Sequence, residues 1–183
     1  TTHTGASNRL VWGGGMRADS ADSPSALGSP QSLHQSRLFA HDEWRMAEST
    51  VLNVGAMLEN DGMGHRNTSP RASINYHFTP QHTMRAGTSV AYRSPAMLEE
   101  KINIPGQYLA LGGVRPEKIH SKEIGYLGEF NTVGVSVDAR AYFDRVSDII
   151  YVDPSPLGPP NFDGKPYSLS NLLSATYRGF EGT

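Results

Sequence analysis

The stretch Ser69–Glu100, SPRASINYHFTPQHTMRAGTSVAYRSPAMLEE, decides the fold because it contains two alternating segments joined by a very short turn at residues 79–82. Apolar residues occupy every second position on both sides of this turn, namely Ala72, Ile74, Tyr76 and Phe78 before it and Met84, Ala86, Val90 and Tyr92, with Thr88 among them, after it. A period of two predicts strands with one apolar face. Two strands of about ten residues are long enough to cross a bilayer at a tilt of roughly 45°, although a half-buried hairpin of a soluble β domain would alternate in the same way.

The same alternation recurs along the rest of the chain and predicts about eight strands. Besides the two hairpin strands, they are expected at residues 8–19, 35–46, 50–60, 118–130, 133–144 with a continuation to 153, and 169–180. The alternation is cleanest in the seventh strand, whose apolar set is Val133, Val135, Val137, Ala139, Ala141 and Phe143. The fold class predicted from this pattern is all-β.

The connections between these segments alternate in length. Long connections are expected at 20–33 and 61–68, which are polar, at 95–116, which is predicted to be irregular, and at 153–167, which is rich in Pro. Short turns are expected at 47–49, 79–82 and 131–132. In an antiparallel up-and-down meander, alternate connections lie at opposite edges, so all the long loops would lie at one end. Outer-membrane barrels show this asymmetry, and a soluble sandwich has no physical reason for it.

The composition excludes several classes of protein. The chain has 183 residues with 19 Gly, 12 Pro and no Cys, so neither a disulfide framework nor a cysteine zinc site is possible. A net charge of −2 and the absence of a basic cluster argue against a nucleic-acid partner. No apolar run approaches the roughly 18 residues of a transmembrane helix, a test that cannot detect membrane-spanning strands.

Catalytic and metal-binding patterns find no support. Gly13–Gly15 lacks the spacing of a dinucleotide-binding fingerprint, and there is no G-x-S-x-G motif. The seven His residues show no HExxH or similar ligand spacing, and are expected to be solvated or lumen-facing. We therefore predict no metal site, no catalytic residues and no enzymatic activity.

Four separated phrases carry a resemblance to a known family. They are LFAHDEW at 38–44, AYRSPAMLEE at 91–100, RPEKIHSKEIGYLGEF at 115–130 and RGFEGT at 178–183. Together they resemble TonB-dependent outer-membrane receptors, especially the ferric-siderophore receptors. His41 stands where Gln is more usual. The matching motif positions are Arg93, Pro95, Glu99, Pro116, Glu117 and Glu123.

The resemblance implies part of a large transmembrane β-barrel. Such receptors have about 22 strands and an N-terminal plug, so residues 1–183 would form a partial barrel domain without plug, TonB-contacting segment or terminal strands. The parent protein is then expected in the bacterial outer membrane, where it would bind and import a ferric siderophore with TonB-derived energy. Its partners would be the TonB complex, through the plug, the siderophore and membrane lipid, with no cofactor. The piece alone is expected to be unable to transport and to self-associate through its edges and apolar face.

The resemblance also suggests roles for individual residues. The motif residues are expected to be architectural: Pro95 would end strand pairing, and Arg93 with nearby acids would tie the loop base to the strand. Lumen-facing charges are expected at Arg71, Arg85, Arg93, Glu129, Asp138 and Arg140. Aromatic and cationic side chains suited to an anionic ferric chelate are Tyr108, Arg115, Tyr142 and Tyr151.

Two other classes of function remain open from the sequence. A soluble, lipocalin-like β module for a small ligand would place its apolar faces inward. An outer-membrane enzyme would need a nucleophile or metal constellation, which the sequence does not show.

Overall fold

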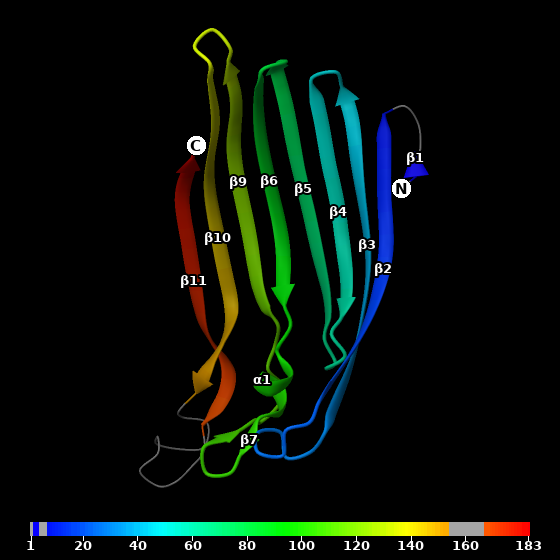
Figure 1. The fold of residues 1–183 in the computed structure, drawn as a ribbon, viewed down its shortest axis with the longest axis vertical. Coiled ribbons are helices and arrows are strands. Elements are labelled where there is room, and N and C mark those ends of the chain that lie inside the picture. The colour runs from blue at the N-terminus through cyan, green and yellow to red at the C-terminus, as the bar shows by residue number, and fades with distance from the viewer. Residues whose placement is uncertain (1, 4–6, 154–166) are drawn as a thin grey trace.

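The structure, a computed structural model, describes residues 2–3, 7–153 and 167–183 and consists mainly of one antiparallel sheet (Figure 1). The strands lie side by side in chain order, so the predicted all-β meander is confirmed. Eight of them are long, and β1 pairs with β2 over only two residues. The strands of this sheet are β1 (Thr2–His3), β2 (Asn8–Ala21), β3 (Gln31–Ala47), β4 (Thr50–Asn60), β5 (Arg66–Thr79), β6 (His82–Arg93), β9 (Glu117–Phe130), β10 (Val135–Asp153) and β11 (Ser168–Gly182).

The long connections lie at one end of the sheet and the short turns at the other (Figure 1). Residues 22–30, 61–65 and 94–116 form the end that we call the loop end, and the turns after β3, β5 and β9 form the opposite end. Most of the connection predicted at 153–167 lies outside the described residues. This arrangement brings chemically diverse side chains from distant parts of the chain together at the loop end.

Several strand boundaries differ from the prediction. The second long strand begins at Gln31 rather than Gln35, because β2 and β3 stay paired as far as Ala21 opposite Gln31. The seventh begins at Val135, and Val133 lies in the preceding turn, where its N–H donates to the carbonyl of Phe130 at 3.0 Å. Hydrophobic alternation does not reveal these ends, because pairing continues into polar segments and a turn can contain valine.

The connection predicted as irregular at 95–116 is ordered, which corrects that prediction. It contains α1 (Met97–Lys101) and a small hairpin of β7 (Asn103–Ile104) and β8 (Tyr108–Leu109). The helix is held at its start by the Glu99 carboxylate, which accepts a hydrogen bond from the Ala96 N–H at 2.6 Å. A five-residue helix has too few periodic positions to be recognised from hydrophobicity.

The strand register gives the sheet one apolar and one polar face. Directly paired residues share a face, and one row across the sheet reads Trp44, Leu52, Ile74, Ala86, Ile124, Ala141 and Phe180. The neighbouring row on the other side reads Glu43, Asn53, Ser73, Gly87, Glu123, Tyr142 and Gly179. We call these two sides the apolar face and the polar face.

The apolar residues do not converge on an interior. Among the described residues the buried hydrophobic side chains are Leu27, Leu33, Val114 and Ile150, whereas Met16 is 93% exposed and Phe180 73% exposed. A lipocalin-like module would bury its apolar set, so this alternative is not favoured. No helix in the described part of the chain has the length and apolar character needed to cross a membrane.

Candidate functional site

The polar face carries a shallow cavity near the middle of the sheet. Its volume is about 350 Å³, and Arg71 lies in its wall. The Arg71 guanidinium contacts the His41 ring, with 3.1 Å between Nη2 and Nδ1, and makes no ion pair with any carboxylate of the described residues. The lining residues are His41, Asn53, Arg71, Ala72, Ser73, Gly87, Thr88, Ser89, Ser121 and Glu123.

Arg85 is a second cation on this face without a carboxylate partner among the described residues. Its Nε is buried and finds no hydrogen-bond acceptor in that part of the chain. The side chain packs over Gly125, where an added Cβ would lie 2.6 Å from Nε. A glycine therefore permits this close approach. Arg71 and Arg85 thus leave positive charge on the polar face that no carboxylate of the described residues neutralises.

Some other charges on the polar face are paired within the sheet. Arg140 contacts Glu123 at 3.3 Å and Glu181 at 2.7 Å, which joins strands β9, β10 and β11. At the far edge Arg9 contacts Glu43 at 3.3 Å. Exposed pairs of this kind contribute little to stability, so their main effect is to neutralise charge.

A second group of polar contacts closes the base of the 94–116 connection. Arg93, the last residue of β6, donates to Glu99 at 2.9 and 3.1 Å and to Glu117, the first residue of β9, at 2.7 Å. Glu117 also accepts the backbone N–H of Ile150 at 2.8 Å. One guanidinium therefore links β6, α1 and β9, and Glu117 extends the link to β10.

The Arg93 guanidinium and the Glu117 carboxylate lie at the loop end, beyond the apolar residues of β6 and β9. The hydrogen bond from Arg93 lowers the pKa of Glu117 below its ordinary value, although partial burial acts in the opposite direction. The same hydrogen bond, followed by those that Arg93 donates to Glu99, raises the pKa of Arg93. Both groups stay ionised near neutral pH.

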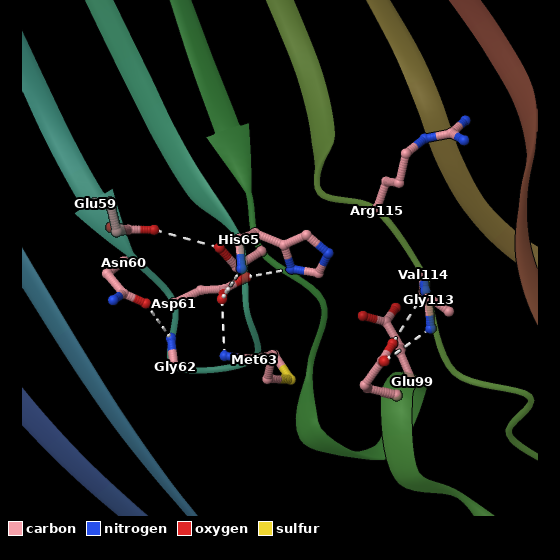
Figure 2. A network of polar contacts seen from close by, with 12 residues as sticks. Glu59, Asn60, Asp61, Gly62, Met63, His65, Glu99, Gly113, Val114 and Arg115 are labelled. Carbon is pink, nitrogen blue, oxygen red and sulfur yellow. Dashed lines mark hydrogen bonds and ion pairs between the residues drawn. The ribbon is translucent and has the colours of Figure 1, made fainter.

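Two buried carboxylates organise the neighbouring loops (Figure 2). Asp61 is 0% exposed and accepts the N–H groups of Met63 at 2.8 Å and His65 at 3.0 Å, while its second oxygen contacts His65 Nδ1 at 2.8 Å. Glu100 accepts the N–H groups of Gly113 at 2.9 Å and Val114 at 3.1 Å. The 61–65 and 94–116 connections are therefore fixed by internal hydrogen bonds.

Arg115 is engaged in a third contact at the loop end. Its guanidinium pairs with Asp148, and its backbone N–H donates to the Asn171 side chain at 2.7 Å. Asp148 has a φ of 57°, a left-handed conformation unusual for a residue other than glycine, and lies at a register shift between β10 and β11. Asn171 donates to the Asp148 carbonyl and so holds this bulge in place.

The structure does not bring the four predicted ligand-binding residues into one site. Tyr142 lies on the polar face within β10, and Tyr151 is nine residues further along the same strand, roughly 30 Å away at about 3.3 Å per residue. Tyr108 lies in the β7–β8 hairpin, where its ring meets that of Tyr167 at 5.8 Å between centroids. Arg115 is already neutralised by Asp148. Their contact with a ligand stays a prediction.

The six charges predicted to face a lumen all lie on the polar face, as the register of Arg71, Arg85, Arg93, Glu129, Asp138 and Arg140 shows. The lumen itself stays a proposal. The architectural motif residues divide into two groups, because Arg93 pairs with both Glu99 and Glu117, whereas Glu123 pairs with Arg140. Pro95 and Pro116 flank the ordered connection.

Sequence reasoning missed several residues that the fold makes important. Asn53, Ser73 and His41 line the central cavity, and strand alternation could have placed all three on the polar face. Asp61 and Glu100 gave no sequence signal, because their partners are backbone N–H groups of loops. Within residues 2–3, 7–153 and 167–183, no cluster of three or more potential metal ligands occurs.

The fold and its polar face agree with a family comparison. The profile described as "TonB dependent receptor-like, beta-barrel" matches residues 2–183. The chain belongs to this family. Membership of the TonB-dependent receptor family places the chain in the bacterial outer membrane, in agreement with the names of its relatives.

The curated relatives of this receptor barrel are distant in sequence. The iron-regulated outer membrane virulence protein of Vibrio cholerae is 24% identical over 155 residues, which cover 79% of this chain and 24% of that protein. The vitamin B12 transporter BtuB of Vibrio vulnificus is 29% identical over 108 residues, covering 59% of this chain and 15% of the transporter.

Solved receptors superpose closely on the sheet. The siderophore receptor PirA from Pseudomonas aeruginosa gives a TM-score of 0.83 at 19% identity, covering 96% of this chain and 35% of PirA. A mutant ferric enterobactin receptor from the same organism, in complex with enterobactin, gives 0.82 at 20% identity, covering 99% of this chain and 31% of the receptor. The receptor barrel described here thus spans about a quarter of its first curated relative and about a third of these structures.

Proposed function

We propose that this chain is part of the wall of an outer-membrane receptor that binds a ferric siderophore and imports it with TonB-derived energy. The observation that carries the proposal is the unneutralised positive charge of Arg71 and Arg85 on the polar face, opposite the apolar face. Ferric siderophore complexes are commonly anionic, and guanidinium groups bind oxygen-rich anions well. The similarity to solved siderophore receptors supports the same class of ligand.

Under this proposal the polar face lines the lumen, and the apolar face contacts lipid. The charges on the polar face then have two uses: Arg71 and Arg85 attract the chelate or a plug, and paired groups such as Arg140 and Glu123 keep the wall hydrated. The loops held by Asp61, Glu100 and Arg93 form a rigid entrance. Under the same proposal, the 183-residue segment by itself is expected neither to transport nor to act as an enzyme.

The test uses the full-length receptor that contains this segment, produced in a strain lacking its own siderophore receptors. Binding of ferric enterobactin is followed by quenching of tryptophan fluorescence, and uptake by radioactive iron in cells with and without TonB. We expect binding in both strains and uptake only with TonB. Uptake of vitamin B12 without any iron uptake would refute the siderophore proposal.

The role of the two arginines is tested with Arg71→Gln and Arg85→Gln, with Arg17→Gln as the matched control because Arg17 already pairs with Asp19 at 2.8 Å. Loss of a charge-assisted hydrogen bond to the chelate weakens binding by about 10- to 100-fold. Unchanged affinity with slowed uptake would assign the arginines to contact with a plug instead.

A further inference from the structure

The charged side chains of β9, β10 and β11 differ between the two faces of the sheet. The polar face of these strands carries Arg140 and six carboxylates: Glu117, Glu123, Glu129, Asp138, Asp144 and Glu181. The apolar face of the same strands carries Lys118, Lys122, Arg145 and Arg178, together with His120. Strand alternation alone does not require a group of basic residues on a face that is otherwise largely apolar.

The basic residues on the apolar face are neighbours. His120 lies directly opposite Arg145, and Lys122 and Arg178 lie on either side of Phe143 in one row. With strands about 4.8 Å apart, Lys122 and Arg178 are separated by about 10 Å, within reach of one ligand for side chains of this length. We call Lys122, Arg145, Arg178 and His120 the basic patch. All four side chains are exposed.

Nothing in the described part of the chain neutralises this patch. Lys122, Arg145 and Arg178 make no ion pair there, and His120 contacts only the Thr88 hydroxyl, at 3.1 Å. Neighbouring like charges on a strand pair are destabilising. A bound anion that is not part of the protein would offset the repulsion between these unpaired cations.

The patch has a fixed position relative to the apolar residues. On β9 the basic positions precede Ile124, on β10 Arg145 follows Phe143, and on β11 Arg178 precedes Phe180. Given the strand directions, the basic residue lies on the loop-end side of the apolar residues in each case (Figure 1). In a bilayer that is the level of the lipid headgroups, where long basic side chains meet phosphate.

A groove on the apolar face begins at the same place. Its volume is about 580 Å³, its floor contains the small side chains Ala40, Ala56 and Ala72, and its walls include Val54, Val90 and His120. His120 therefore belongs to both the patch and the groove. These alanine and valine side chains offer apolar contact to a hydrocarbon chain, and Asp42 and Thr88 are polar residues that also line the groove.

We propose that the basic patch binds the phosphate of a membrane lipid in the leaflet at the loop end, and that an acyl chain of this lipid lies in the adjoining groove. The cations supply charge-assisted hydrogen bonds to a phosphomonoester. Lys118, whose ammonium lies 5.9 Å from the centre of the Tyr92 ring, extends the basic surface towards the loops. The bound lipid would remain attached to the receptor as a structural lipid.

The test uses the full-length receptor in dodecyl maltoside, titrated with dioleoyl phosphatidic acid and observed by native mass spectrometry. The variant Lys122→Gln/Arg145→Gln/Arg178→Gln is compared with Arg9→Gln/Arg17→Gln/Arg45→Gln, which removes three cations from the polar face. Each charge near an anionic lipid changes affinity by about fivefold, so we expect at least a tenfold loss for the patch variant and no loss for the control. Equal losses would overturn the proposal.

Two further arms separate the lipid from other anions and from nonspecific adhesion. Dioleoyl phosphatidylcholine should bind at least tenfold more weakly than phosphatidic acid, and 10 mM inorganic phosphate should leave the binding of phosphatidic acid unchanged. Full competition by phosphate would show that the patch binds free anions and would refute the lipid proposal.

The groove is tested with Ala56→Leu, which should weaken the binding of dioleoyl phosphatidic acid but not that of dihexanoyl phosphatidic acid. The absence of a difference would refute the placement of an acyl chain in the groove. Should the triple variant fail to insert, the single variants Arg145→Gln and Arg178→Gln carry the same comparison, with about fivefold losses expected.

Discussion

Ala139 offers a direct measurement of what the apolar face contacts. It lies on that face of β10, opposite Tyr126 of β9, and is four residues from both Val135 and Phe143. At about 3.3 Å per residue and a tilt of about 40°, it lies some 10 Å in depth from either end of this apolar run. In a band about 25 Å tall, Ala139 is thus close to the midplane of the hydrocarbon layer.

The substitution Ala139→Arg should therefore be costly in a membrane and nearly neutral in water. Arginine at the midplane of an outer-membrane barrel costs about 2–4 kcal/mol, and near the interface about 0–1 kcal/mol. A loss of 2–4 kcal/mol corresponds to roughly a 30- to 900-fold change in the folding equilibrium constant. Thr176→Arg, on the apolar face of β11 opposite Arg145, should fall in the lower range because it lies beside the basic patch.

The assay is urea unfolding of the full-length receptor in phospholipid vesicles, followed by tryptophan fluorescence. Ser136→Arg, on the polar face of the same strand, is the matched control, and should change stability by less than about 0.5 kcal/mol. If Ala139→Arg and Ser136→Arg cost the same, the two faces of β10 would experience the same surroundings. The assignment of one face to lipid would then be wrong.

Three further predictions concern the loop end. Arg93→Met removes the link between β6, α1 and β9, and should raise the rate of proteolysis within residues 94–116 several-fold, whereas Arg17→Met should not. Because the pKa of Glu117 is lowered in the folded state, the stability that its ionised carboxylate contributes is present above the ordinary pKa of 4.5 and is lost as the pH falls further. Protection of residues 94–116 from hydrogen exchange, relative to the intrinsic exchange rate at each pH, should therefore decrease below pH 4.5, and Arg93→Met should lack this decrease. Asp61→Ala leaves two loop N–H groups without their acceptor and should destabilise residues 61–65 by about 1–3 kcal/mol, seen as faster exchange there, while the exposed Asp22→Ala changes little.

Much of the wall could be predicted from alternation alone, and the reason is physical. A strand between lipid and water must present opposite chemistry at successive positions, so Val135 to Phe143 identify both the strand and its faces without knowledge of its neighbours. The strand at Thr50–Asn60 was predicted to the residue. Antiparallel order follows as well, because short turns join only adjacent strands.

The loop end could not be predicted in the same way. The pairing of Arg115 with Asp148 joins residues 33 positions apart, and it requires the bulge that Asp148 makes with its positive φ. The helix α1 depends on Glu99 bonding to both Ala96 and Arg93. Such contacts arise from tertiary geometry, which local periodicity does not contain.

The basic patch represents a third case, because its signal was present in the sequence. Lys118, His120 and Lys122 share parity with Ile124, so alternation places them on the apolar face of β9. Arg145 likewise shares parity with Phe143. The significance of these positions depends on the register, since only paired strands show that the cations of β9, β10 and β11 are neighbours.

The isolated 183-residue chain provides a final prediction that separates a membrane wall from a soluble module. Its apolar face leaves Trp12 66% and Leu38 65% exposed, and in the described part of the chain β11 pairs on one side only. Apolar surface and an unpaired strand edge both favour association. We expect the chain to sediment as large assemblies in buffer and to be dispersed by dodecyl maltoside.

Sedimentation velocity with and without detergent measures this difference, and the variant Trp12→Ser/Leu38→Ser tests its cause. Removing two large exposed apolar side chains should reduce association in buffer, because each contributes apolar area that is covered only by contact. A soluble barrel would bury these side chains, so the same variant would destabilise it and increase its aggregation. A compact monomer of the unaltered chain in buffer would contradict the open, two-faced wall on which the receptor proposal rests.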